Sequence, residues 1–455
     1  MKKFALYHNL PLALDDSRVY SLLRSSITGG LSNVMHRINI AGESHISHFH
    51  HADNTIISKN TPNIMTHIMG VDFNSLYPSA YSSIKNCFGK RMYIPWHCEF
   101  YTTKMDVLNR IIAEHDKLFI VSLKGHIKES HINKCLFFPP IIRNLTFNTN
   151  EDIVGTKMMD TMKHQLLHIG KRETKITQLI STHNQFMSFT NEHLFYMIKE
   201  CGLVIDDLKE MAVFSKNAVF KTFACALMDQ LVKAIAEGNK NEALFMKLLL
   251  NSSYAYDSMN TEIFPKTALL SKEETVRSQI FLSFVSSQKP GANVSTVEQQ
   301  PRQAACCTCL QSAVWTLDNA KVWYLRFVFI FMMKCLNLER IHFIEGDTDS
   351  AYWSICGHSK LGINQGFDAL FINREFNNKH VGYWFPGTSD VKEQKKLLGL
   401  TVERVCDWMI TLSPKSYTIR CNGIEIMKNK GVNTNDNYMS FAAKVIGMDG
   451  TLKEI

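Results

Sequence analysis

The sequence predicts an α+β fold in which an antiparallel sheet is combined with a helical hairpin. Two observations carry this prediction. Residues 341–355 have the pattern of two strands joined at an acidic turn. Residues 218–256 carry two helical patterns separated by a Glu-Gly-Asn turn at 237–239. Further elements are expected at LFIVSL (118–123, strand), FFPPII (137–142, strand), 193–201 (helix) and 304–336 (one long helix).

Composition excludes few functions. Among 455 residues, Lys and Arg exceed Asp and Glu by 50 − 42 = 8, and the isoelectric point of about 8.8 allows a nucleic-acid partner without requiring one. The most apolar stretch, 322–336, contains Arg326 and Lys334 and is shorter than the roughly 20 residues that span a bilayer. We therefore expect a buried helix there and no membrane partner.

The twelve cysteines are scattered, and the first residues contain no sustained apolar run of the kind found in signal peptides. These two features predict a reducing, intracellular compartment. They do not distinguish nucleus from cytoplasm.

The acidic turn lies in HFIEGDTDSAYW, His342–Trp353, which is apolar, then acidic, then apolar. Asp347 and Asp349 stand two residues apart at the bend. A hairpin tip with two carboxylates is unfavourable unless a cation neutralises them. The turn is therefore a candidate metal site.

A second acidic position is Asp72 in GVDFNSLYPS, where it ends a short apolar run and Pro78 follows near the expected start of a helix. Two carboxylates from distant segments can hold two divalent ions about 3.5 to 4 Å apart, one activating an attacking hydroxyl and the other stabilising a leaving phosphate. Oxygen ligands of this kind favour Mg²⁺.

The second predicted helix of the hairpin carries KLLLNSSY at 247–254. At about 100° per residue, Lys240, Lys247, Asn251 and Tyr254 share one face. Two ammonium groups, an amide and an aromatic ring suit a nucleoside triphosphate. Taken alone, the pattern is equally that of a solvated helix face.

In SPKSYTI, residues 413–419, Lys415 and Tyr417 alternate along a predicted strand and are expected to point the same way. A cation beside a phenol can hold a nucleic-acid backbone or a primer end.

In this order, the four segments resemble the motifs of family B DNA polymerases. DFNSLYPS is similar to the first catalytic motif, KLLLNSSYA to the fingers motif, EGDTDS to the second catalytic motif and PKSY to the lysine-x-tyrosine motif. The long insertion between Asp72 and Lys247, with Gly29-Gly30 upstream, is most like the protein-primed branch found in adenovirus-like viruses and self-replicating mobile elements.

The resemblance implies template-directed DNA synthesis, in which a dNMP is added to a primer 3′-hydroxyl, or to a protein primer, with release of pyrophosphate. Asp72 and Asp349 would ligate two Mg²⁺ ions, and Asp347 would lie beside them. Tyr77 would exclude the ribose 2′-hydroxyl. The remaining site residues are Lys240, Lys247, Asn251 and Tyr254 for the nucleotide, and Gly29, Gly30, Lys415 and Tyr417 for DNA. The implied partners are template and primer DNA, dNTPs and a terminal-protein primer.

The resemblance also implies a right-hand polymerase with palm, fingers and thumb, in which the palm sheet is antiparallel. Only 71 residues precede Asp72, too few for a typical exonuclease domain, so we expect a truncated copy or an exonuclease-free form. The expected divisions are 1–70 (connecting segment), 71–95 (palm), 96–212 (inserted subdomain), 213–258 (fingers), 259–300 (turn-rich second insertion), 301–419 (palm) and 420–455 (thumb or C-terminal remnant).

Three positions depart from the family pattern. Ala255 replaces a usual Gly, Glu345 a usual Tyr and Ile27 a frequent Tyr. Glu345 shares strand parity with the two aspartates, so it either faces the metals or leaves that side at a bulge. Two other functions stay open: a two-metal nuclease, which does not need Lys247, and a decayed mobile-element copy that only binds DNA.

Three other patterns have simpler interpretations. The histidines at 45, 48, 50 and 51 are expected in a solvated loop rather than a metal site. The single CxxC within Cys306–Cys309 lacks a second pair for zinc and predicts cysteines in a helix core. The stripe of Trp315, Trp323, Phe327 and Phe331 predicts the core face of a helix packed under the acidic strands.

Overall fold

The computed structural model is an α+β fold of helices and antiparallel sheets, as the sequence predicts. Every pairing between named strands in the described part of the chain is antiparallel. The structure describes residues 14, 16–53, 55–82, 92–148, 150–151, 156–164, 172–218, 220–260, 266–300, 308–385 and 399–428.

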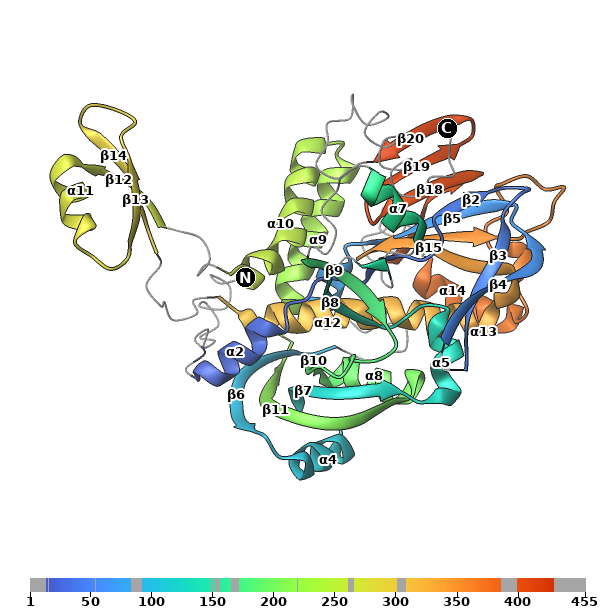
Figure 1. The fold of residues 1–455 in the computed structure, drawn as a ribbon, viewed down its shortest axis with the longest axis horizontal. Coiled ribbons are helices and arrows are strands. Elements are labelled where there is room, and N and C mark those ends of the chain that lie inside the picture. Colours follow the sequence, from blue (N-terminus) through green and yellow to red (C-terminus); the bar gives the residue numbers. More distant parts are fainter. Residues whose placement is uncertain are drawn as a thin grey trace.

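The central sheet has five strands in the order β1-β15-β16-β5-β17, and its strands β5 and β15 are labelled in Figure 1. Their bounds are β1 (Ser32–Val34), β15 (Ile341–Asp347), β16 (Ser350–Ile355), β5 (His67–Asn74) and β17 (Gly399–Cys406). Strand β5 is apolar on both faces and almost wholly buried, which suits the middle of a sheet. A Cβ atom at Gly70 would lie 2.6 Å from Cε1 of Tyr352, so glycine allows that ring to pack across the strand.

One long helical run lies under this sheet. It comprises α12 (Leu310–Arg326), a π-helical stretch (Phe327–Met332) and α13 (Met333–Cys335). The ring of Phe73 in β5 contacts the rings of Tyr324 and Phe327, with centroids 5.4 and 6.1 Å apart. The predicted long helix is confirmed from Leu310 onwards, and its expected start falls outside the described residues. Of the predicted core stripe, Trp315, Phe327 and Phe331 are buried and Trp323 is half-buried.

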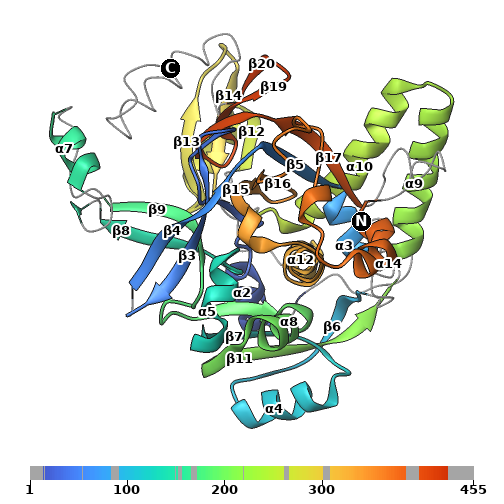
Figure 2. The same ribbon diagram turned by 90° about the vertical axis from the view of Figure 1, so that its right-hand side faces the viewer.

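A second sheet, in the order β10-β7-β11-β6, lies on the opposite side of α12, which Figure 2 shows end-on between the two layers. The expected strand at 118–123 is confirmed within β7, and the expected helix at 193–201 within α8. The elements of this region are β6 (Ile94–Thr102), α4 (Met105–Glu114), β7 (Leu118–Ile127), α5 (Glu129–Leu136), β10 (Met187–Thr190), α8 (Asn191–Cys201) and β11 (Leu203–Asn217).

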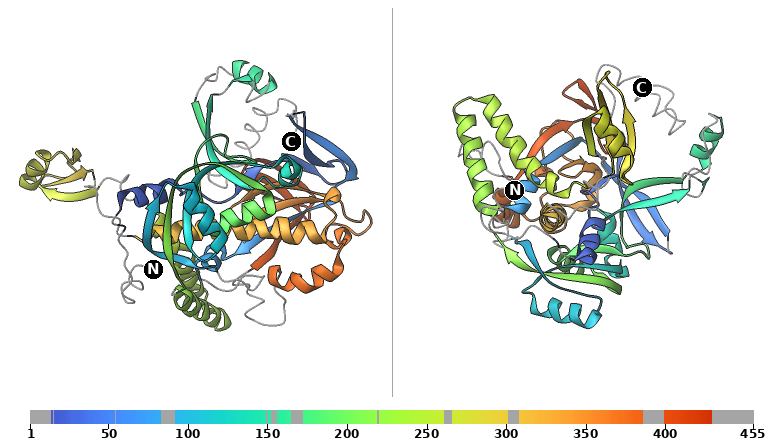
Figure 3. Two further views of the ribbon diagram at one scale, coloured as in Figure 1. Left: turned by 90° about the horizontal axis from the view of Figure 1, so that it is seen from below. Right: turned by 90° about the vertical axis from the view of Figure 1, so that its left-hand side faces the viewer.

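The predicted strand at 137–142 is largely wrong. Only Ile141 and Ile142 enter a strand, because Pro139 and Pro140 have no N–H to donate to a sheet. Strand β8 (Ile141–Asn148) pairs with β9 (Arg172–Leu179), and this ribbon runs toward α7 (Thr156–His164) at the periphery (Figure 3).

The predicted helical hairpin is confirmed as α9 (Phe220–Ala236) and α10 (Lys240–Ser258), which stand side by side in Figures 1 and 2. The side chain of Asn239 accepts a hydrogen bond from the Glu242 N–H and caps α10. Helix α3 (Leu76–Tyr81) follows β5, and the Tyr81 hydroxyl donates to the Leu250 carbonyl at 3.0 Å. The hairpin is thus attached next to the central sheet.

Two regions that were expected to be irregular are ordered. The segment 259–300 contains β12 (Lys266–Ser271), α11 (Lys272–Gln279), β13 (Phe284–Gln288) and β14 (Val294–Gln299), a small unit that stands apart in Figure 1. The capping box of Ser271 and Glu274 is a helix signal that the sequence analysis missed. The expected turn-rich segment thus also contains three strands and a helix.

The histidine-rich segment is a hairpin of β3 (His45–Ala52) and β4 (Thr55–Ile64), so the expected solvated loop is wrong. Its anchor is Ile46, which is fully buried, and the Ser47 N–H donates to Nδ1 of His342 at 3.0 Å. Among the described residues, no group of three or more His, Cys, Asp or Glu side chains is arranged to hold a metal ion. Of the CxxC residues, Cys309 precedes α12 and is buried, whereas Cys306 lies outside the described residues.

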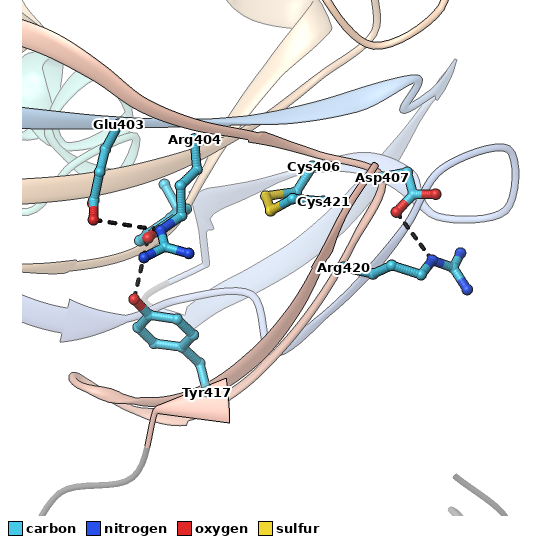
Figure 4. Close-up of a disulfide and its surroundings, with 8 residues drawn as sticks. Glu403, Arg404, Cys406, Asp407, Tyr417, Arg420 and Cys421 are labelled. Atoms are coloured by element: carbon cyan, nitrogen blue, oxygen red, sulfur yellow. Dashed lines mark hydrogen bonds and ion pairs between the residues drawn. A yellow bond between two sulfur atoms is a disulfide. The ribbon is translucent and has the colours of Figure 1, made fainter. Parts of the chain in front are cut away.

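A four-stranded sheet, in the order β2-β18-β19-β20, completes the region beside the central sheet. A disulfide joins Cys406 at the end of β17 to Cys421 at the end of β19 (Figure 4), and the scattered cysteine spacing did not predict it. No helix in the described ranges is long and apolar enough to cross a membrane. The remaining elements are β2 (Ile38–Ile40), β18 (Trp408–Ser413), β19 (Ser416–Cys421), β20 (Ile424–Lys428), α2 (Ser17–Ser25) and α14 (Arg374–Trp384), and most of the expected thumb falls outside the described residues.

Candidate active site

Asp72 and Asp349 come together where β5 ends and β16 begins. Ser350 is the register partner of Asp72, and the Phe73 N–H donates to the Asp349 carbonyl at 2.8 Å. The bend between β15 and β16 is tight because Thr348 has a φ of 68° and the Asp349 N–H donates to the Asp347 carbonyl at 2.8 Å. Local sheet pairing therefore brings together two acids that are far apart in the sequence.

The two carboxylates lie in an environment that does not neutralise their negative charge. Burial raises the pKa of Asp72 to about 6, with a further contribution from Glu403. Burial also raises the pKa of Asp349 to about 6, and here the charge of Asp72 is the next cause. In the described part of the chain, neither carboxylate forms a hydrogen bond or an ion pair with another residue. The arrangement favours a bound cation, because only a positive charge would relieve both the burial and the mutual repulsion.

Asp347, two residues from Asp349, is neutralised within the protein. Its carboxylate lies 2.6 Å from Nζ of Lys415 and accepts a hydrogen bond from the Ser32 hydroxyl at 3.0 Å. The two aspartates of the acidic turn thus differ: Asp349 is grouped with Asp72, and Asp347 is grouped with Lys415.

Helix α10 presents part of its predicted face to this pair. The charge of Lys247 lowers the pKa of both Asp72 and Asp349 and so partly opposes the effect of burial. The ring of Tyr254 stacks on that of Tyr77 in α3, with centroids 4.1 Å apart. Burial raises the pKa of both hydroxyls, with smaller contributions that include the charge of Asp349. Cationic and aromatic groups therefore lie next to the acidic pair.

Two other predicted residues of α10 differ in their distance from the pair. Asn251 lies one turn from both Lys247 and Tyr254 and is half-buried. Lys240 is the first residue of the helix, roughly 10 Å along the axis from Lys247 at 1.5 Å per residue, and it is exposed. Asn251 therefore lies on the helical turn between Lys247 and Tyr254, whereas Lys240 lies at the start of the helix.

The Gly29-Gly30 segment packs against the tip of the acidic turn. A Cβ atom at Gly30 would lie 2.6 Å from Cγ2 of Thr348, and the Thr348 N–H donates to the Leu31 carbonyl at 2.7 Å. Gly29 has a φ of 92°, which favours glycine. Gly30 therefore allows the close approach to Thr348, and Gly29 allows the left-handed backbone that precedes it.

The expectation that Lys415 and Tyr417 point the same way along a strand is wrong. Lys415 lies in the turn between β18 and β19 with a φ of 62°, and its side chain is exposed except at Asp347. Tyr417 is buried in β19, and its hydroxyl lies 3.2 Å from that of Tyr352. In Figure 4 the side chain of Arg404 points toward Tyr417. The turn at Ser413–Ser416 breaks the strand alternation on which the expectation rested.

Glu345 lies on the sheet face of Asp347 and Asp72, one of the two alternatives left open by the sequence, because its pairing with Tyr352 continues without a break to the pairing of Asp347 with Ser350. The register of β15 against β16 shifts between Phe343 and Glu345. The Glu345 side chain is 1% exposed, and burial raises its pKa to about 8 although Lys428 and the Lys415 N–H oppose the shift. Glu345 therefore belongs with the β18–β19 turn.

Two neighbours of the site were missed by the sequence analysis. Glu403 in β17 raises the pKa of both Asp72 and Asp349, and no sequence pattern marks it. Tyr324 is buried in α12, and after burial the charges of Asp349, Glu345 and Asp72 are the next causes of its raised pKa. Tyr324 lies at helical spacing from Phe327 and Phe331, so the core stripe contained a signal for it.

The donor set of the site matches magnesium. Two uncompensated carboxylates offer hard oxygen ligands, and Mg²⁺ is commonly held by one or two protein carboxylates, with its other ligands taken from water and substrate phosphates. The residues present therefore fit divalent ions of this kind.

Comparison with known proteins gives a similar fold. No protein-family model and no curated protein sequence matches this chain. The structure of Phi29 DNA polymerase complexed with primer-template DNA and incoming nucleotide substrates matches with a TM-score of 0.51 and 14% identity, covering 95% of this chain and 59% of that chain. Its post-translocation binary complex with primer-template DNA matches with a TM-score of 0.51 and 14% identity, covering 95% and 57%. This chain thus spans less than two thirds of either structure, and at this identity the likeness concerns the fold.

Proposed function

We propose that this chain is a DNA-directed DNA polymerase that adds a dNMP to a primer 3′-hydroxyl and releases pyrophosphate. The observation that carries the proposal is the uncompensated pair of Asp72 and Asp349, with Lys247 close enough to lower the pKa of both. Two carboxylates that face a lysine on a neighbouring helix suit metal-bound triphosphate chemistry. The fold likeness to Phi29 DNA polymerase with primer-template DNA and nucleotide supports the same assignment.

In this proposal each side chain has a defined role. Asp72 and Asp349 hold two Mg²⁺ ions, which when bound stabilise charge on the attacking and leaving oxygens. Lys247 holds the triphosphate, and Asn251 and Tyr254 line the position of the new base pair. Tyr77, stacked on Tyr254, limits the space for a ribose 2′-hydroxyl.

The DNA contacts follow from the surrounding turns. Lys415 has an exposed side chain that can reach a phosphate. In the Gly29-Gly30 segment, Gly29 has open space at its Cβ position and lets the backbone come close to DNA, while Gly30 packs on Thr348. The buried Tyr417 supports the Lys415 turn through Tyr352 and does not itself offer a free face. Lys240, at the margin of the site, contributes positive charge for an approaching nucleotide.

The same proposal gives the architecture its names. The five-stranded sheet with α12 forms the palm, the α9–α10 pair forms the fingers, and the thumb belongs to the C-terminal residues. The partners are template and primer DNA and dNTPs. The insertion at 96–212 and the Gly29-Gly30 segment favour the protein-primed branch of family B, with a terminal protein as primer.

The decisive experiment is extension of a labelled primer on a DNA template with Mg²⁺ and dNTPs. The wild type should extend the primer, and Asp349→Asn should not. Asp407→Asn is the matched control, because Asp407 pairs with Arg420 at 3.1 Å outside the site and its loss should leave extension unchanged. A folded wild type that binds primer-template but never extends it would instead identify a DNA-binding relic.

The same gel separates polymerase from nuclease. Lys247→Ala should sharply reduce dNTP incorporation, because the triphosphate loses its cationic partner. A two-metal nuclease would shorten the labelled strand without dNTPs and would tolerate this substitution. Shortening that persists in Lys247→Ala and disappears in Asp349→Asn would contradict the proposal.

A further inference from the structure

A buried ion pair lies in α12, away from the Asp72–Asp349 pair. Nζ of Lys321 is 3.0 Å from Oδ1 of Asp318, and the two side chains are only 5% and 6% exposed. On its other oxygen, Asp318 accepts a hydrogen bond from the Thr190 N–H at 3.0 Å and lies 3.3 Å from Nδ1 of His193. Burying two charges is unfavourable unless their geometry is well satisfied, so a specific use of the pair is worth seeking.

Within the described ranges, Lys321 makes one further hydrogen bond beyond this pair. Its ammonium group donates a hydrogen bond to the Thr28 hydroxyl at 3.1 Å. Thr28 immediately precedes Gly29-Gly30, the segment that packs on Thr348 at the tip of the acidic turn. Lys321 therefore fixes the start of the segment whose end contacts the turn.

The contacts continue along the segment without a gap. The Leu31 carbonyl accepts from the Thr348 N–H at 2.7 Å, the Ser32 hydroxyl donates to Asp347 at 3.0 Å, and Ser32 is the register partner of Asp347 in the β1–β15 ladder. Thr348 separates Asp347 from Asp349. A displacement of Thr28 would thus be transmitted to the turn that carries Asp349.

We propose that Lys321 is a positioning residue, which through Thr28 holds the Gly29-Gly30 segment against Thr348 and thereby sets the position of Asp349. Asp318 serves as its counter-ion, and Thr190 and His193 of the inserted region fix the Asp318 carboxylate. Lys321 then links the Thr190–His193 part of the inserted region to the segment that packs on the acidic turn. The part of this inference that concerns reaction rate rests on the proposed polymerase function.

Thr28→Val is the decisive variant, because it removes the hydroxyl and leaves the Lys321–Asp318 pair intact. Lys321→Met would leave Asp318 without its ammonium partner and endanger folding. Two control variants are compared with Thr28→Val. Thr28→Ser keeps the hydroxyl. Thr316→Val removes a buried hydroxyl of α12 whose hydrogen bond in the described part of the chain is to the Ser312 carbonyl of its own helix.

The first readout is hydrogen–deuterium exchange, which does not depend on activity. The Thr348 amide should exchange faster in Thr28→Val than in wild type, and at the wild-type rate in Thr28→Ser and Thr316→Val. Unchanged exchange in Thr28→Val overturns the proposal. This result stands even if the wild type extends no primer, in which case the proposed function fails separately.

The second readout is steady-state primer extension. Thr28→Val should lower kcat roughly 10- to 100-fold, as misplacement of a catalytic group does, with the KM for dNTP within about twofold of wild type. Thr28→Ser should restore the rate. Faster exchange of Thr348 combined with wild-type kcat would show that the segment does not set the position of Asp349, and the proposal would be wrong.

Discussion

Asp318 and the Asp72–Asp349 pair are carboxylates withdrawn from water, yet their pKa values shift in opposite directions. Burial raises the pKa of Asp318, but Lys321, His193 and the Thr190 N–H outweigh it and lower the pKa below the usual range. Burial raises the pKa of Asp72 and Asp349 to about 6, and no side chain of the described residues pairs with either. Asp347 has two partners within the protein, the exposed Lys415 ammonium group and the Ser32 hydroxyl.

This difference shows that depth of burial does not by itself identify a site. The most deeply buried acid of the three environments is the best satisfied, and its role is to hold parts of the fold together. The pair that is less buried and lacks a partner destabilises the metal-free protein, and such an arrangement is expected where a ligand supplies the missing charge. Four predictions test the comparison.

The largest effect is expected from Asp318→Asn. Removing one partner of a buried ion pair leaves Lys321 charged and buried, which should lower the free energy of unfolding by about 3 to 5 kcal/mol. Chemical denaturation followed by tryptophan fluorescence would measure it. The double variant Asp318→Asn with Lys321→Met should recover part of the loss, and a loss below about 1 kcal/mol would show that the pair is not structural.

Asp72→Asn should change the free energy of unfolding in the opposite direction. The folded protein binds this proton more tightly than the unfolded chain, whose Asp titrates near pH 4. Ionised Asp72 therefore lowers the free energy of unfolding. This destabilisation is complete above about pH 6 and absent below about pH 4. Without divalent ions at pH 7.5, Asp72→Asn should stabilise the protein by about 1 to 3 kcal/mol. A gain that persists at pH 4, or destabilisation at pH 7.5, would contradict this reading.

Mg²⁺ should stabilise the wild type by binding to the same pair. A stabilisation of about 1 to 2 kcal/mol, measured as a rise in Tm, is expected when Mg²⁺ is present at about ten times its Kd. The shift should shrink as the pH falls through about 6, because protons compete for the two carboxylates. Asp72→Asn should abolish the stabilisation by Mg²⁺. Asp318→Asn should keep it, even though that variant is less stable than the wild type.

Lys415→Met should have the smallest effect on folding. The Lys415 side chain is 63% exposed, and exposed ion pairs contribute about 0 to 1 kcal/mol, so the free energy of unfolding should change by less than about 1 kcal/mol. If Lys415 contacts the DNA backbone, the KM for primer-template should nevertheless rise, and the salt dependence of DNA binding should weaken. A large loss of stability would place Lys415 with Lys321 as a structural residue.

Much of the fold follows from local patterns. The hairpin of α9 and α10 was predictable because apolar residues recur at helical spacing on both sides of the Glu237-Gly238-Asn239 turn. Strands β15 and β16 were predictable because two apolar runs flank an acidic bend. The β3–β4 hairpin was missed because its strands are polar and gain their burial from Ile46 and the contact with His342. Lys415 was misplaced because strand alternation cannot detect a turn whose central residue has a positive φ.

The sequence by itself determined which residue types could perform metal and phosphate chemistry and the order in which they occur. Only the tertiary structure decided which of them share an environment. It paired Asp72 with Asp349, tied Asp347 to Lys415, buried Glu345 beside the Lys415 backbone and enclosed Asp318 with Lys321. The physical reason is that the charge state and partners of a carboxylate depend on burial and on neighbours from distant segments, and neither is encoded in local spacing.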